Sequence, residues 1–117
     1  MLVTGPNAII TVAVSSSLAA AIDIGDGGLV AIQMPSAWTA ASVTFQASAH
    51  LNGTYNDVYD ITGTELSITG AAASRYIPLN ASTFGGMRYI KIRSGTTGTP
   101  VVQTANRTIR TLVRRLS

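Results

Sequence analysis

Few side chains in this sequence are of the types that usually perform catalysis or bind metals. The chain has no cysteine and a single histidine, His50. Thiol chemistry, disulfides and thiolate zinc sites are therefore excluded, and one chain cannot supply a His–His metal pair. His50 precedes Asn52-Gly53, a strong hairpin signal, so we interpret it as a surface residue at a hairpin tip and not as a general base.

The carboxylates form no recognisable acid/base pair. Asp57 and Asp60 are three residues apart on or near a predicted strand, which directs them to opposite faces. Asp23 and Asp26 lie in a glycine-rich segment that lacks the ligand spacing of an EF-hand loop. We interpret them as turn formers, with a calcium site as the alternative. We therefore predict a protein that is not an enzyme and needs no cofactor or metal ion.

The charges are few and unevenly distributed. Charged residues make up 11% of the 117 residues, against about 25% in a typical soluble domain. All five acids precede residue 75, and all eight bases lie at residue 75 or after it. This asymmetry predicts either pairing of early strands with late ones within the chain, or subunits that meet acid to base. The low charge also favours assembly, because charge keeps bare surfaces apart.

The strongest candidate interaction surface is a group of four arginines within nine residues near the end of the sequence. On a strand, Arg110 and Arg114 share one face. We favour pairing with acids of a neighbouring subunit over a solvated face or a nucleic-acid site, since no nucleic-acid-binding motif is present. Trp38 is expected to pack over one end of the core, with a sugar-stacking or interface anchor as the alternative. The predicted interface comprises Arg107, Arg110, Arg114, Arg115, Asp57, Asp60, Glu65 and Trp38.

The hydrophobic pattern has a period of two, with turn signals roughly every 8–12 residues, which predicts an all-β antiparallel β-sandwich of about eight strands. Val43, Phe45 and Ala47 are expected to face the core, as are Ile90 and Ile92, whereas Tyr89, Lys91 and Arg93 should face out. Pro78 indicates an edge strand, and residues 80–86 a loop. The predicted strands cover residues 8–14, 18–24, 29–34, 42–49, 55–59, 65–69, 75–79, 87–93 and 107–116.

One domain spanning residues 1–117 is expected, because a chain of this length forms a single core. No run of 18 apolar residues is present, so we predict no membrane span. Residues 1–7 carry no charged side chain and are interpreted as a possible N-terminal arm that extends onto a neighbour.

Four segments together carry a resemblance to a known group of proteins. They are Trp38-x-x-Ala41-x-Val43-Thr44-Phe45-Gln46-x-Ser48, Gly53-Thr54-Tyr55-x-Asp57-Val58-Tyr59-Asp60, Arg75-Tyr76-Ile77-x-Leu79 and Met87-Arg88-Tyr89-Ile90-Lys91-Ile92-Arg93-Ser94-Gly95. Over residues 30–115 the chain is similar to small proteins encoded among the structural genes of tailed bacteriophages and prophages. It also resembles jelly-roll sandwiches of the discoidin or galactose-binding type.

The phage resemblance implies a virion component of the head-decoration (cement) type. Such a protein would be made in the host cytoplasm, bind the major capsid protein on the capsid surface, form trimers or dimers, and need no cofactor. We expect neither a membrane nor a nucleic acid as partner. The alternative is a jelly-roll module of a phage tail or fibre that binds a carbohydrate or receptor, although few aromatic residues are expected to be exposed for sugar stacking.

Overall fold

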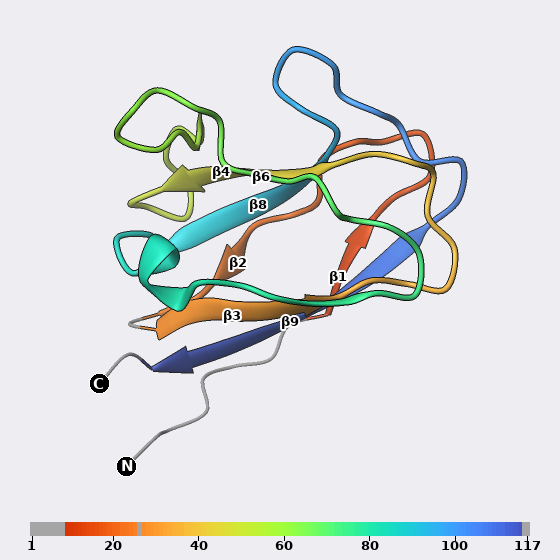
Figure 1. Cartoon of the computed structure of the whole chain (residues 1–117). Helices are drawn as coiled ribbons and strands as arrows, with labels where there is room; N and C mark the ends of the chain where they lie inside the picture. Colours follow the sequence, from red (N-terminus) through yellow and green to blue (C-terminus); the bar gives the residue numbers. More distant parts are fainter. Residues whose placement is uncertain (1–8, 26, 116–117) are drawn as a thin grey trace.

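Two antiparallel sheets pack face to face in the computed structural model, which describes residues 9–25 and 27–115 (Figure 1). The possible N-terminal arm, residues 1–7, lies outside the described residues. The four-stranded sheet has the order β1 (Ile9–Val12), β9 (Arg107–Arg115), β3 (Gly27–Gln33) and β7 (Tyr76–Pro78). The other sheet has the order β2 (Ile22–Asp23), β8 (Tyr89–Ser94), β4 (Val43–Ser48) and β5 (Asn56–Asp57), and β6 (Ser67–Ile68) also pairs with β4. The predicted all-β sandwich is confirmed.

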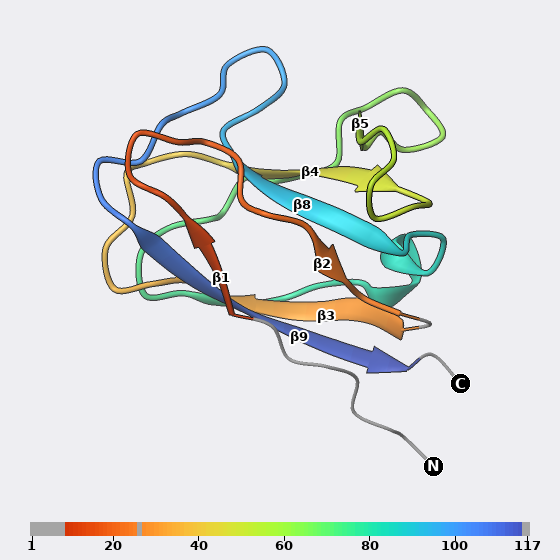
Figure 2. The ribbon, with the colours of Figure 1, turned by 180° about the vertical axis from the view of Figure 1, so that it is seen from behind.

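The order of the strands is that of a jelly roll. The chain passes repeatedly from one sheet to the other, so that the first described strand pairs with the last and Ile9 lies opposite Arg110. Figure 2 shows the same wrapping from behind, with β2 beside β8 and β1 beside β9. Pro78 lies in β7, an edge strand, as the sequence predicts for a residue that cannot donate a ladder hydrogen bond.

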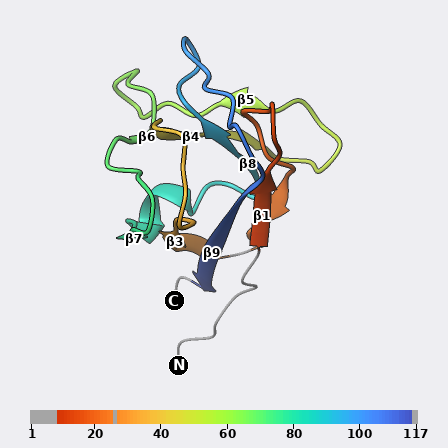
Figure 3. The ribbon, with the colours of Figure 1, turned by 90° about the vertical axis from the view of Figure 1, so that its right-hand side faces the viewer.

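The core lies between the two sheets, which Figure 3 shows edge on. Val43 and Phe45 of β4 and Ile90 and Ile92 of β8 are fully buried, as their alternation with polar residues predicts. Ala47 is half-buried and packs against the same core. Further buried side chains come from β1, β3 and β9: Ile10, Val12, Leu29, Ile32, Ile109 and Val113.

A short 3₁₀ helix, η1 (Ala81–Phe84), occupies the segment expected to be a loop. The Asn80 carboxamide oxygen accepts hydrogen bonds from the Ser82 backbone N–H and hydroxyl, which fixes the start of the turn. Phe84 then enters the core, and its ring meets Phe45 edge to face with centroids 5.3 Å apart. One helical turn is too short to produce a period of 3.6 in the sequence. Among the described residues, no helix is long and apolar enough to cross a membrane.

The strand predicted over residues 18–24 is interrupted. Leu18 lies opposite Arg93, whereas Ile22 lies opposite Ile90, so four steps along this segment match three steps along β8. The extra residue is a bulge, which leaves β2 with two paired residues and explains why the continuous strand prediction is wrong here.

Phe45→Ala should lower the free energy of unfolding by about 3–5 kcal/mol, because it leaves a cavity beneath Phe84 in the centre of the sandwich. Urea denaturation followed by circular dichroism would measure the loss. Leu51→Ala, at a half-exposed hairpin position, is the control and should change stability by less than about 0.5 kcal/mol. Equal effects of the two substitutions would contradict the assignment of Phe45 to the core.

Candidate interaction surfaces

The outer face of the four-stranded sheet carries a row of exposed side chains that crosses all four strands. Arg110 of β9 lies opposite Ile9 of β1 on one side and Gln33 of β3 on the other, and Gln33 in turn lies opposite Tyr76 of β7. Ile9 and Tyr76 are each more than half exposed. Arg114 is also exposed and lies opposite Gly28. We call the exposed residues of this surface the basic face: Ile9, Thr11, Gln33, Tyr76, Pro78, Thr108, Arg110 and Arg114.

Of the two other arginines of β9, Arg107 does not belong to the basic face. Arg107 is half-buried, and its Nε donates to Oε1 of the buried Gln103 at 3.1 Å. The Gln103 side chain also bonds both the backbone N–H and the carbonyl of Thr39, so Arg107 helps to hold the loop that contains Trp38. Arg115 pairs with Gly27 through the backbone, and its side chain lies outside the described part. The predicted stripe therefore consists of Arg110 and Arg114.

All four acids that the structure describes lie on the side of the five-stranded sheet. Asp23 belongs to β2 and Asp57 to β5, while Asp60 and Glu65 belong to the hairpin that follows β5. No acidic residue occurs within β1, β3, β7 or β9. The described acids thus share one side of the sandwich, and they share it with Arg88, Lys91 and Arg93 in and beside β8.

Arg93 is the centre of a buried ionic cluster on the outer side of the five-stranded sheet. Its Nη1 lies 2.7 Å from Asp57 Oδ1 and its Nη2 lies 2.9 Å from Glu65 Oε2. Two further hydrogen bonds join Nε to Thr44 Oγ1 and Nη2 to Thr97 Oγ1. The Arg93 residue is only 6% exposed. We call these residues the Arg93 cluster: Thr44, Asp57, Glu65, Arg93 and Thr97.

The expectation that Arg93 faces solvent is therefore wrong. Arg93 does lie on the outer side of β8, as alternation predicts, but Asp57 of the edge strand β5, Glu65 of the hairpin after it and Thr97 of the loop after β8 bond its guanidinium and cover it. The pKa of Asp57 is lowered from 3.8, first by its hydrogen bond from Arg93. The carboxylate is thus stabilised in its charged form, as an ion pair in a poorly solvated place requires.

Asp60, the third acid of the predicted interface, and Trp38 also make contacts within the chain. The Asp60 Oδ1 accepts hydrogen bonds from the Thr62 backbone and hydroxyl and from the Thr64 backbone, which lowers the pKa of Asp60. Trp38 packs against the core and donates its indole N–H to the Ala41 carbonyl at 3.1 Å, in line with the predicted packing role. The ion pairs of Asp57 and Glu65 with Arg93 confirm, for these two acids, the predicted pairing within the chain. Pairing between subunits stays a prediction.

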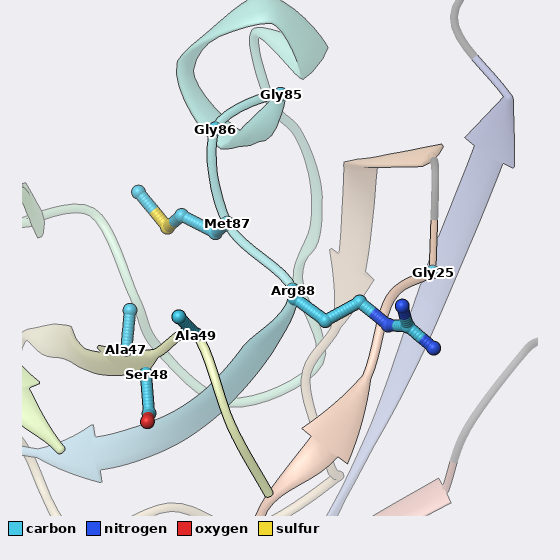
Figure 4. Close-up of a pocket in the computed structure, with 8 residues that line it drawn as sticks. All are labelled: Gly25, Ala47, Ser48, Ala49, Gly85, Gly86, Met87 and Arg88. Atoms are coloured by element: carbon cyan, nitrogen blue, oxygen red, sulfur yellow. The ribbon is translucent and has the colours of Figure 1, made fainter. Parts of the chain in front are cut away.

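A hollow of about 490 Å³ lies between the end of β4 and the turn before β8 (Figure 4). Its lining consists mainly of small residues, among them Ala47, Ala49, Gly85 and Gly86. Arg88 points away from them towards Gly25, and its guanidinium binds both carboxylate oxygens of Asp23, at 2.7 and 3.1 Å. The charged group beside this hollow thus already takes part in an ion pair.

His50 lies exposed at the tip of the hairpin that joins β4 and β5, where the sequence predicts it. Its carbonyl accepts hydrogen bonds from the Gly53 N–H and from the Ser48 hydroxyl, which closes the turn. Asp23 likewise accepts from the Gly25 N–H, as expected of a turn former. In the described ranges, no group of three or more His, Cys, Asp or Glu residues could hold a metal ion.

Comparison with known proteins finds no relative: no family model, no curated protein and no solved structure matches the chain. The basic face and the Arg93 cluster therefore have no counterpart from which a role could be transferred.

Arg93→Met should lower the free energy of unfolding by about 3 kcal/mol, because it leaves the Asp57 and Glu65 carboxylates without their cation. Urea denaturation at neutral pH would measure this loss. Arg110→Met removes the same charge from an exposed strand position and should change stability by less than about 0.5 kcal/mol. Similar losses in both variants would show that Arg93 contributes no more to the free energy of unfolding than an exposed arginine does.

Arg93→Met should also raise the pKa of Asp57 in the folded protein, since its main stabilising hydrogen bond is removed. The pKa of Asp57 in the wild-type protein is lowered, so the ionised carboxylate stabilises the fold. This stability is present above about pH 4 and is lost as the pH falls through the pKa of the folded state. Carbon-detected NMR titration of the side-chain carboxyl would give both values. An unchanged Asp57 pKa in the variant would refute this account.

Proposed function

We propose that the chain is a non-enzymatic structural protein of a phage virion, which decorates the head by docking its basic face on an acidic area of the major capsid protein. The observation that carries this proposal is the basic face itself: an exposed sheet surface with Arg110 and Arg114, whose four strands contain no acid. The assignment to a virion is what the resemblance given in the sequence analysis implies. Asp57 and Glu65 both bind Arg93 and so serve the structure of the subunit. This agrees with a protein that acts through its contact surfaces.

The composition of the basic face favours an acidic partner over a second copy of the same face. Two copies brought together there would oppose arginines with arginines, and like charges within an interface disfavour association. The rest of the face is uncharged, with Ile9, Tyr76 and Pro78 exposed beside hydroxyl and amide side chains. Such a mixture of apolar area, aromatic ring and arginine is typical of the residues enriched in protein–protein interfaces.

A direct test is mass spectrometry of purified virions of the phage whose genome encodes the chain. The proposal expects the protein in intact heads, in a fixed ratio to the major capsid protein. Its absence from washed virions would reject the proposed function, whatever its other binding properties.

Arg110→Glu combined with Arg114→Glu should abolish binding to heads that lack the protein, because both positive charges of the basic face become negative. Wild-type binding should weaken with added salt, since the Debye length falls to about 10 Å at 0.1 M. Co-sedimentation with heads would measure binding, and circular dichroism would check the fold.

The matched control is Arg88→Glu with Lys91→Glu, which changes the net charge equally on the side of the five-stranded sheet. This control should still bind. Equal loss in both double variants would point to net charge, and unchanged binding of the Arg110 and Arg114 variant would remove the basic face from the interface.

A carbohydrate-binding module of a tail or fibre is the second candidate, and it is favoured by Tyr76. Its half-exposed ring lies beside Gln33 at a hollow of about 320 Å³ that Arg75 also lines. An aromatic face next to amide and guanidinium donors is a combination suited to a sugar. Glycan-array binding that is lost in Tyr76→Ala and kept in Leu51→Ala would favour this function over decoration.

A further inference from the structure

The hairpin between β5 and β6 ends in a tightly fixed turn. Tyr59 and Glu65 form its last antiparallel bridge, and the Asp60 N–H donates to the Thr64 carbonyl at 2.8 Å. The Gly63 N–H donates to the Asp60 carbonyl at 3.0 Å, and Gly63 has a φ of 85°, which favours glycine. With the three hydrogen bonds that Asp60 Oδ1 accepts, the turn is ordered by residues at its two ends.

Ile61 stands at the corner of this turn and is fully exposed. Its relative exposure is 105%, whereas the other exposed large hydrophobic residues of the described chain lie between 51% and 59%. Asp60 and Gly63 satisfy the chemistry of the turn, and positions such as this one usually carry a polar residue or proline. Nothing in the fold of the subunit therefore accounts for a β-branched apolar side chain at this position.

An apolar groove of about 290 Å³ lies directly beside Ile61. Its wall is formed by Val58, Leu66 and Met87, which are half-buried and pack against the core. Asp60 also lines the groove, but its Oδ1 is bonded within the turn. A protruding apolar side chain and an apolar groove thus share one edge of the molecule.

We propose that this edge is the contact surface of a two-fold dimer, in which Ile61 of each subunit inserts into the groove formed by Val58, Leu66 and Met87 of the other. A two-fold contact requires one surface patch to be complementary to itself, and a projection next to a groove meets this requirement. The described lining of the groove has no basic side chain, so it offers nothing to an acidic partner, and its one carboxylate, Asp60, is bonded within the turn through Oδ1. Because the turn is already ordered, little conformational entropy is lost when Ile61 is buried.

This dimer does not depend on the identity of the partner of the basic face. Ile61 lies in the hairpin between β5 and β6 of the five-stranded sheet, whereas Arg110 and Arg114 lie on β9 of the other sheet. The two surfaces can therefore be disrupted separately. A monomeric variant that still binds phage heads would leave the decoration proposal intact. A dimer that binds no heads would leave the dimer proposal intact.

Sedimentation equilibrium of the full chain tests the dimer. The wild type should sediment as a dimer, and Ile61→Asp should raise its dissociation constant at least about 100-fold, because a charged group would replace the central apolar side chain on both sides of the axis. Val102→Asp is the matched control, since Val102 is an exposed apolar residue between β8 and β9, and it should dimerise like the wild type. Circular dichroism should show that all three chains are folded.

A second measurement uses the absence of cysteine from the sequence. Ile61→Cys places one thiol near the proposed axis and should give a disulfide-linked dimer on mild oxidation, faster than Val102→Cys at equal concentration. A wild type that remains monomeric at its highest soluble concentration, an Ile61→Asp variant that still dimerises, or equal oxidation rates of the two cysteine variants would each overturn the proposal.

Discussion

The outer half of this sandwich depends on the burial of one guanidinium group. A desolvated arginine is tolerated only when its N–H donors are bonded and its charge is balanced. Arg93 meets this requirement with partners from β4, from β5, from the hairpin after it and from the loop after β8. Unlike β4, the other three segments contribute few side chains to the core, so the Arg93 cluster stabilises their position as apolar packing stabilises the two sheets.

The result is a sandwich with two unlike outer sides. On the side of the five-stranded sheet, Asp57 and Glu65 bind Arg93, and Asp23 binds Arg88. On the outer side of the four-stranded sheet, a continuous row of side chains from Ile9 to Tyr76 stays exposed. The charge asymmetry of the sequence has two parts in the structure: most of the described acids are neutralised locally, while Arg110 and Arg114 remain exposed on the opposite face.

The sequence predicts the inward side chains of β4 and β8 because a half-buried strand has a period of two. Local signals such as Asn52-Gly53 and Pro78 likewise predict a hairpin and an edge strand correctly. Burial of Arg93 is not predictable in this way, because alternation assigns a side chain to a face but does not say what covers that face. The strand order, too, depends on contacts between distant residues, and only the jelly-roll resemblance indicated it. Asp60 and Gly63 are ordinary turn signals, and the isoleucine between them is the one that stands out, since turns rarely need such a residue there.

The pairing of β1 with β9 has a consequence for how the protein is made. β9 lies between β1 and β3, so these two strands have no common partner until the last described strand has left the ribosome. Folds dominated by such distant pairings form slowly and gain their stability late. Arg110 and Arg114 are themselves carried by β9. Chains whose synthesis stops before β9 therefore lack both the completed sheet and its arginines.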